Sequence, residues 1–342
     1  MKSQLLPFAL AALAGVSNAA TAEEWAQRSI YQVITDRYAR SSDLGAECEI
    51  ANYCGGTYAG IVERLDYIQN MGFTALQISP INENLNQTTM YGQAFHGYWP
   101  QNLLELNLNF GTADDLKNLS AELHARDMYL LVDVVANEMA YDIGDANMTS
   151  TTYIDYYDFV PFNDAKYYNA YCPITDWNNV TEYQNCWLGY EGVATPHLAI
   201  QDSEVASQLG TWIKNLVSEY DIDGIRLDGA KQMVYEFIAP FVEEAGVYSM
   251  GEVDDGLASF VCNYQNMTAG LENYPVYYTI IDAFTAGEMS ELVSMVSQVR
   301  EACTSPQYLA TFIENQDNER FASYTDDIAV SSSPPEFHFL NH

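Results

Sequence analysis

The chain has 342 residues and is strongly acidic, with 47 Asp and Glu against 13 Lys and Arg and a formal net charge of −34 at pH 7. This charge argues against nucleic acid or an anionic membrane surface as a partner, whereas a neutral polymer is compatible with it. The 26 tyrosines, 14 phenylalanines and 5 tryptophans supply rings that stack on sugars, although most aromatics of a large domain belong to its core.

The first twenty residues read as a signal peptide. A basic start at Met1 and Lys2 is followed by an apolar run over residues 5–16 and by small residues over 17–22. The apolar run is shorter than the ~20 residues that span a bilayer, and no later segment reads as transmembrane. We therefore expect residues 1–20 to be removed and the protein to be secreted, with cell-wall or cell-surface association left open.

Strand and helix patterns alternate along the rest of the chain. The patterns predict strands over residues 30–35, 74–79, 128–135, 224–227, 247–251, 270–274 and 308–313. They predict helices over residues 61–70, 113–126, 205–219, 233–244 and 289–299. The expected fold is a (β/α)8 TIM barrel, because such alternation implies a parallel sheet. Residues 21–136 form its first part, 137–200 an irregular inserted domain after strand 3, and 201–329 its second part.

Six cysteines in an exported chain predict a disulfide framework. Their sequence clusters favour local pairs over the many other pairings: Cys48 with Cys54, Cys172 with Cys186, and Cys262 with Cys303. Glycosylation sequons agree with passage through the secretory route and occur at Asn86, Asn118, Asn147, Asn179 and Asn266.

Three acidic residues stand where predicted strands end: Asp228, Glu252 and Asp317. In a barrel of βα units the carboxyl ends of strands carry the active site. Arg226 lies two residues before Asp228, so the period of a strand directs both side chains to one face. The guanidinium should favour the ionised form of Asp228. Neighbouring barrel strands are about 4.8 Å apart, which allows the ~5 to 5.5 Å carboxyl separation of a retaining glycosidase.

Four ordered segments resemble the signature regions of the α-amylase family, glycoside hydrolase family 13: residues 133–137, 224–228, 251–253 and 314–318. Further segments resemble the fungal secreted α-amylases in particular: residues 95–99, 111–116, 186–189, 273–275 and 320–324. The resemblance runs from about Trp25 to Ala329. It implies hydrolysis of internal α-1,4 bonds of starch-like or glycogen-like glucans through a glycosyl-enzyme.

The resemblance also implies residue roles. Asp228 matches the nucleophile, Glu252 the general acid and base, and Asp317 the third carboxylate, which holds substrate hydroxyls. Substrate contacts are implied for Arg226, His96, Tyr98, Trp99, Lys231 and Gln316.

Three departures from the family pattern bear on activity. Glu138, Gln232 and Gln316 stand where the family has histidine. They resemble a subgroup of fungal amylase-like 4-α-glucanotransferases, which transfer the glycosyl group to another sugar. Transfer is therefore the close alternative to hydrolysis, since water or a sugar hydroxyl can attack the same glycosyl-enzyme.

Calcium is expected only weakly. The family holds the ion with the asparagine that matches Asn137, acids of the inserted domain and a backbone carbonyl. Here Gln184, His197 and Ala199 replace acidic positions, and carboxylates are the hard anionic ligands that Ca²⁺ prefers.

The end of the sequence departs from the family. Residues 330–342 predict neither a helix nor an eighth strand, and the family's C-terminal β-sandwich does not follow. We expect a chain truncated before strand 8. A third possibility is then an inactive, truncated glucan-binding product, which retention of all three carboxylates disfavours.

Overall fold

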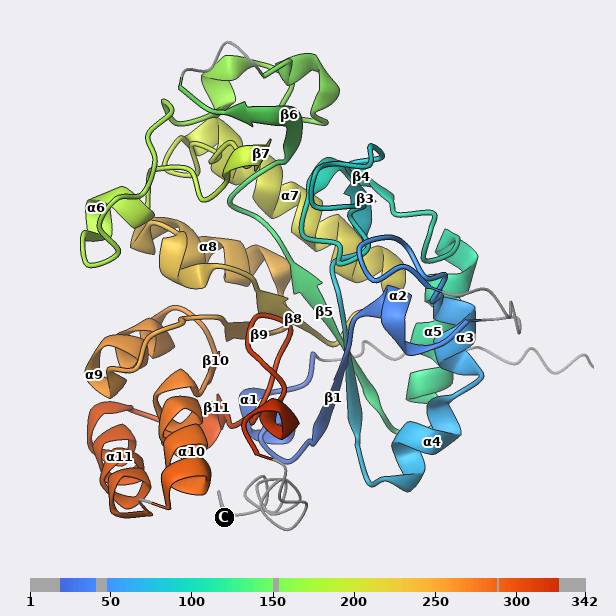
Figure 1. Ribbon diagram of the computed structural model, residues 1–342. Coiled ribbons are helices and arrows are strands. Elements are labelled where there is room, and N and C mark those ends of the chain that lie inside the picture. Colours follow the sequence, from blue (N-terminus) through green and yellow to red (C-terminus); the bar gives the residue numbers. More distant parts are fainter. Residues whose placement is uncertain (1–18, 41–47, 150–153, 288, 326–342) are drawn as a thin grey trace, which may run out of the picture.

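The computed structural model describes residues 19–40, 48–149, 154–287 and 289–325. Within these residues seven parallel strands form one sheet, and their spatial order follows the chain. The strands are β1 (Ile30–Val33), β2 (Ala75–Ile78), β5 (Tyr129–Val134), β8 (Gly224–Leu227), β9 (Tyr248–Gly251), β10 (Gly270–Glu272) and β11 (Leu309–Ala310). The sheet curls with helices outside it (Figure 1), which confirms the predicted (β/α)8 barrel class.

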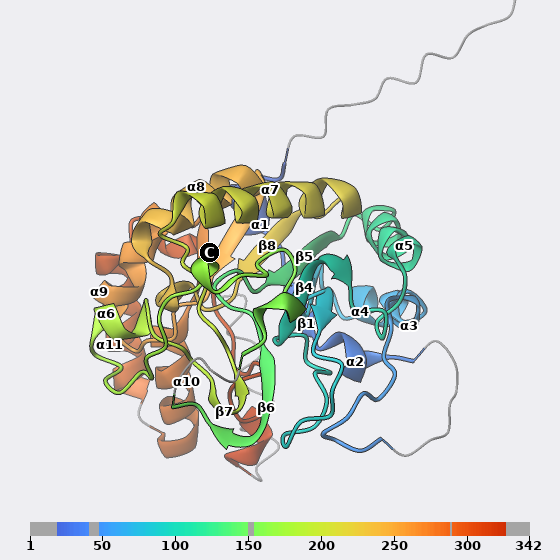
Figure 2. The ribbon, with the colours of Figure 1, turned by 90° about the horizontal axis from the view of Figure 1, so that it is seen from above.

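The helices surround the strands when the molecule is seen from above (Figure 2). They are α1 (Ala22–Trp25), α2 (Thr35–Tyr38), α3 (Tyr58–Val62), α4 (Leu65–Asn70), α5 (Ala113–His124), α6 (Val180–Tyr183), α7 (Ser203–Tyr220), α8 (Tyr235–Ala245), α9 (Ala258–Val261), α10 (Tyr274–Ala286) and α11 (Met289–Ala302). Side-chain caps fix where the long ones begin. Thr112 and Asp115 form a reciprocal capping box at α5, and Asp202 accepts from the backbone of Glu204 at α7.

The amino ends of the strands are closed by Trp25 of α1. Its ring stacks on Tyr248 at 4.8 Å between centroids and contacts Tyr129 at 5.1 Å. Gly224 begins β8 directly beneath this ring, where an added Cβ would lie 2.8 Å from the indole. Because the amino ends are packed in this way, the carboxyl ends are left to carry polar residues.

Two antiparallel two-stranded sheets extend from the carboxyl ends of the barrel strands. One follows β2 and consists of β3 (Asn82–Asn84) and β4 (Pro100–Leu106). The other lies in the insert after β5 and pairs β6 (Tyr141–Asn147) with β7 (Tyr190–Ala194), at the top of Figure 1. The insert returns to the barrel where the backbone amide of Leu198 donates to the carbonyl of Asn137 at 2.8 Å.

Some elements differ from the sequence prediction. The helix expected over residues 61–70 is split into α3 and α4 at Glu63 and Arg64. The seventh strand pairs only over Leu309–Ala310 instead of residues 308–313. Helix α10 was not predicted, because its apolar and tyrosine side chains follow one another without a polar stripe; Pro275 at its first turn was the available signal.

Three disulfides join Cys48 to Cys54, Cys172 to Cys186 and Cys262 to Cys303, the local pairs that the clustering predicts. No helix of the described residues is long and apolar enough to cross a membrane. Residues 1–18 and 326–342 lie outside the described residues. The expectations for a signal peptide, for a missing eighth strand and for residues 330–342 therefore stay predictions.

Candidate active site

Asp228 and Glu252 lie side by side where β8 and β9 end. Leu227 pairs with Gly251 in the parallel register, so the next residue of each strand begins its loop at the same level. The backbone amide of Glu252 donates to the carbonyl of Leu227 at 3.0 Å, which holds the two loops together. Both carboxyl side chains remain accessible, with 21% of Asp228 and 14% of Glu252 exposed. A ligand at the carboxyl end of the barrel therefore reaches both.

A single buried guanidinium lies beneath these carboxyls. Arg226 is fully buried, and its Nη1 donates to Oδ1 of Asp228 at 2.7 Å and to the carboxylate of Asp133 at 2.9 and 3.0 Å. Its Nε donates to Glu272 at 3.3 Å. Its Nη2 lies 2.9 Å from Oε1 of Glu252, close enough for an ion pair but not aligned as a hydrogen-bond donor.

Four carboxyls share this one cation. Burial, opposed by the Arg226 charge, raises the pKa of Asp133 and of Asp228 above the ordinary aspartate value. Burial likewise raises the pKa of Glu272 to about 7. Asp133 and Asp228 accept the short hydrogen bonds from Arg226, whereas the hydrogen bond to Glu272 is longer, at 3.3 Å.

Asp317 lies in the loop after β11 and reaches the same centre. Its backbone amide donates to Oδ1 of Asn315 at 3.0 Å, and Asn315 in turn donates to the hydroxyl of Tyr274 at 3.0 Å. That hydroxyl donates to Oε1 of Glu252 at 3.3 Å. Partial removal of water, together with the charge of Glu252, raises the pKa of Asp317 to about 6. The three predicted acids are thus joined in one network.

Three aromatic side chains from the segment between β3 and β4 form a cluster beside this centre, called the aromatic wall below: His96, Tyr98 and Trp99. Tyr98 donates its hydroxyl to Oδ2 of Asp133 at 2.6 Å, which anchors the wall to the Arg226 centre. His96 stacks on Tyr98 and meets Trp99 edge to face at 4.5 Å between centroids. Burial and the nearby Arg37 charge lower the pKa of His96 to about 4, so its ring is neutral at ordinary pH.

Two further residues predicted to contact the substrate, Lys231 and Gln316, are held by neighbouring polar groups. Lys231 donates its ammonium to the carbonyl of Asp254 at 2.6 Å and to the carboxylate of Asp255 at 3.1 Å. Gln316 donates to Oδ2 of Asp317 at 2.9 Å and accepts from Gln32 of β1. Its amide is therefore already used to orient Asp317.

The residues implied for calcium do not make a calcium site. The side-chain amide of Asn137 is buried, and neither its nitrogen nor its oxygen has a hydrogen-bond partner. His197, which stands at an acidic position of the family pattern, is buried. Its Nδ1 lies 2.8 Å from the carbonyl of Leu198 and its Nε2 lies 3.4 Å from that of Gln232. Among the described residues no group of three His, Cys, Asp or Glu is arranged to hold a metal. Amide and imidazole donors without anionic oxygens do not fit Ca²⁺.

Sequence reasoning assigned no role to three buried acids of the centre. Asp133 stands in the segment 133–137 that resembles a family signature, and its carboxylate accepts from Arg226. Glu272 is the last residue of β10 and contacts Arg226; a charged residue inside a short apolar strand was the available signal. Glu138 follows β5 and was noted only as a departure from the family pattern. Its Oε2 is buried without a partner, burial raises its pKa to about 8, and its charge acts on Asp228.

Comparison with known proteins shows to which family the chain belongs. The family profile of the alpha-amylase catalytic domain matches residues 32–334. The chain belongs to the alpha-amylase family. It is 46% identical to an alpha-amylase of Saccharomycopsis fibuligera over 93% of this chain and 64% of that protein. It is 44% identical to alpha-amylase 1 of Lipomyces kononenkoae over 94% of this chain and 51% of that protein.

A solved alpha-amylase of Malbranchea cinnamomea has the same fold, with a TM-score of 0.86 and 43% identity over 91% of this chain and 66% of that one. The chain therefore spans about half to two thirds of the length of these relatives.

Proposed function

We propose that this protein is a retaining glycosidase that cuts internal α-1,4 bonds of starch-like or glycogen-like glucans. The observation that carries the proposal is the pair of accessible carboxyls, Asp228 and Glu252, on the buried Arg226 at the carboxyl ends of β8 and β9. Contact with one guanidinium is compatible with the ~5 to 5.5 Å separation of retaining enzymes. Family membership and named alpha-amylase relatives support the substrate class.

In this proposal Asp228 attacks the anomeric carbon while Glu252 gives its proton to the departing glycosidic oxygen. Arg226 holds the Asp228 carboxylate in place through the 2.7 Å hydrogen bond. Glu252 then removes a proton from the incoming hydroxyl, which releases the sugar from Asp228. Asp317 binds hydroxyls of the sugar at the cleaved bond, and the aromatic wall contacts the face of that sugar ring.

Transfer to a second sugar is the alternative outcome of the same intermediate. Its supporting feature is the replacement of family histidines by Glu138, Gln232 and Gln316. A water molecule gives hydrolysis, whereas a 4-hydroxyl of another glucan gives an elongated chain. The proposed chemistry up to the glycosyl-enzyme is identical in both cases.

Incubation of the purified protein with maltopentaose tests both outcomes. Shorter products alone indicate hydrolysis, and longer products appearing with shorter ones indicate transfer. Asp228→Asn and Glu252→Gln should each abolish product formation while leaving the circular dichroism spectrum unchanged. Glu301→Gln on the exposed surface of α11 is the matched control and should keep full activity. A folded Asp228→Asn variant that retained more than a few per cent of turnover would contradict the assignment.

A further inference from the structure

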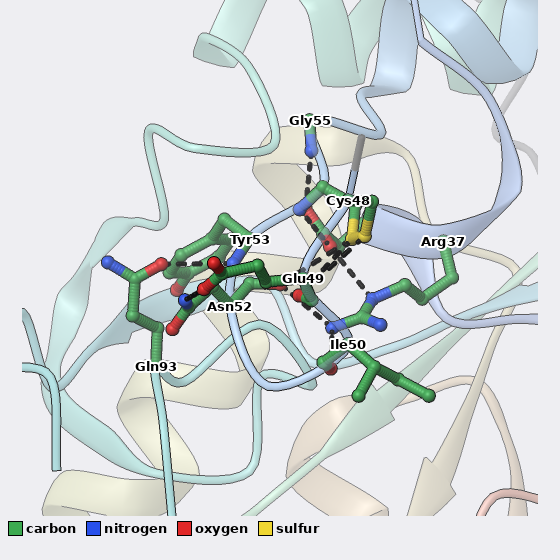
Figure 3. Close-up of a disulfide and its surroundings, with 10 residues drawn as sticks. Arg37, Cys48, Glu49, Ile50, Asn52, Tyr53, Gly55 and Gln93 are labelled. Atoms are coloured by element: carbon green, nitrogen blue, oxygen red, sulfur yellow. Dashed lines mark hydrogen bonds and ion pairs between the residues drawn. A yellow bond between two sulfur atoms is a disulfide. The ribbon is translucent and has the colours of Figure 1, made fainter. Parts of the chain in front are cut away.

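The loop closed by the Cys48–Cys54 disulfide lies beside the segment that carries the aromatic wall, and the proposed mechanism does not use it. Figure 3 shows this loop around the side chain of Arg37 from helix α2. The guanidinium Nη2 donates to the carbonyls of Ile50 at 2.8 Å and Asn52 at 2.9 Å. A planar guanidinium can donate to both carbonyls at once only while the two oxygens keep a fixed spacing. The loop closed by the disulfide keeps that spacing.

The carboxylate of Asp36 completes the attachment of Arg37. It is fully buried, lies 2.9 Å from Nε of Arg37 and accepts from the backbone amides of Cys54 at 2.7 Å and Gly55 at 3.0 Å. The same two residues, Asp36 and Arg37, therefore bind both the carbonyls and the amides of the loop. A buried carboxylate with these partners fixes the guanidinium on one side.

On its other face Arg37 lies over the ring of Phe95, with Cζ 3.5 Å from the ring centroid. Phe95 meets His96 edge to face at 5.3 Å between centroids. Nδ1 of His96 accepts from the backbone amide of Tyr98 at 3.0 Å. The contacts thus run from the disulfide loop, through one cation–π pair, to the ring that forms the wall.

A second set of contacts joins the same loop to the wall segment. The backbone amide of Gln93 donates to the carbonyl of Ala51 at 2.8 Å, and Tyr53 donates its amide to Oε1 of Gln93 at 3.0 Å. The hydroxyl of Tyr53 donates to the carbonyl of Ala94 at 2.9 Å. Gly92 has a φ of +101°, and an added Cβ there would lie 2.0 Å from the carbonyl oxygen of Ala51. The loop therefore lies in close contact with the segment immediately before Phe95.

We propose that Arg37, held by the carbonyls of the Cys48–Cys54 loop, is a positioning residue for the wall formed by His96, Tyr98 and Trp99. The proposal rests on the proposed function, in which this wall binds the sugar at the cleaved bond. Arg37 acts through Phe95 on His96, whereas Tyr98 is anchored independently to Asp133. Loss of Arg37 or of the disulfide should thus weaken substrate binding more than it slows the chemistry at Asp228.

The test compares kcat and KM for maltopentaose in four variants. Arg37→Met and the double variant Cys48→Ser/Cys54→Ser should raise KM by about tenfold, the size of one lost desolvated cation–π contact, with kcat changed less. Arg37→Lys keeps the positive charge over Phe95 but loses the planar guanidinium, so its KM should lie between those of the parent and of Arg37→Met. Cys262→Ser/Cys303→Ser removes the disulfide that joins the residue after α9 to the residue after α11. This variant should have a lower melting temperature and an unchanged KM.

An NMR titration of the His96 ring gives a readout that needs no activity. Arg37→Met removes the nearby charge and loosens the packing, so the pKa of His96 should rise from about 4 toward its ordinary value of 6.5. An inactive parent protein would contradict the proposed function, while the His96 titration would still test the positioning. A folded Arg37→Met variant with unchanged KM, or with an unchanged His96 titration, would overturn the inference.

Discussion

Glu138 should make the folded protein less stable as pH rises, and Glu138→Gln should remove that dependence. The carboxyl is buried, its Oε2 has no partner, and burial raises its pKa from 4.5 to about 8. Below pH 4.5 both the folded and the unfolded chain hold the proton. Between 4.5 and about 8 only the unfolded chain releases it, so stability falls across that window. The shift corresponds to about 5 kcal/mol once both states are ionised.

Urea unfolding of the parent and of Glu138→Gln at several pH values from 4 to 8.5 measures this term. The glutamine has nearly the same shape and stays neutral, so the variant should gain about 5 kcal/mol relative to the parent between the two ends of the range. Glu301→Gln, an exposed change on α11, controls for the effect of the substitution itself. A stability difference between Glu138→Gln and the parent that stayed constant within about 1 kcal/mol over the range would refute the burial argument.

Two further predictions concern the centre and the insert. Arg226→Lys should lower the free energy of unfolding by about 3 to 5 kcal/mol in urea titrations, because a single ammonium cannot contact Asp133, Asp228 and Glu272 together. An unchanged urea concentration at the unfolding midpoint would contradict the stabilising role of the buried guanidinium. Chelation should leave the melting temperature unchanged, because Asn137 and His197 supply a buried amide and a buried imidazole instead of the carboxylates that Ca²⁺ prefers. A large drop restored by calcium alone would show that a calcium-binding site stabilises the fold.

The barrel strands were predictable from sequence because most of their side chains are apolar, as is typical of strands buried in parallel sheets. β2 and β8 are buried at every position; the predicted bounds of β8 match the observed ones, and those predicted for β2 extend one residue further at each end. The period of a strand also placed Arg226 and Asp228 on one face, and the 2.7 Å hydrogen bond confirms that placement. Local pattern and tertiary packing agree at these positions.

Other features depend on contacts between distant segments, which a linear pattern does not contain. The proton affinity of Glu138 arises from burial under the insert, where Thr195 is its neighbour. The direction in which burial shifts the pKa of Asp228 also differs from the simple expectation of an aspartate beside an arginine, because removal of water outweighs the single charge. The sequence therefore predicted where these acids lie along their strands, but it did not predict how far each carboxyl is removed from water.

The electrostatics of the centre follow from counting charges around Arg226. Four carboxyls contact one buried guanidinium, and Glu138 adds a fifth acidic group whose charge acts on Asp228. If all were ionised, mutual repulsion in a poorly hydrated space would exceed what one cation compensates. Burial raises the pKa of Glu272 to about 7 and that of Glu138 to about 8, so a proton on either carboxyl relieves part of that repulsion. Glu272 and Glu138 therefore influence how much negative charge faces Asp228, whose carboxyl Arg226 holds in place through the 2.7 Å hydrogen bond.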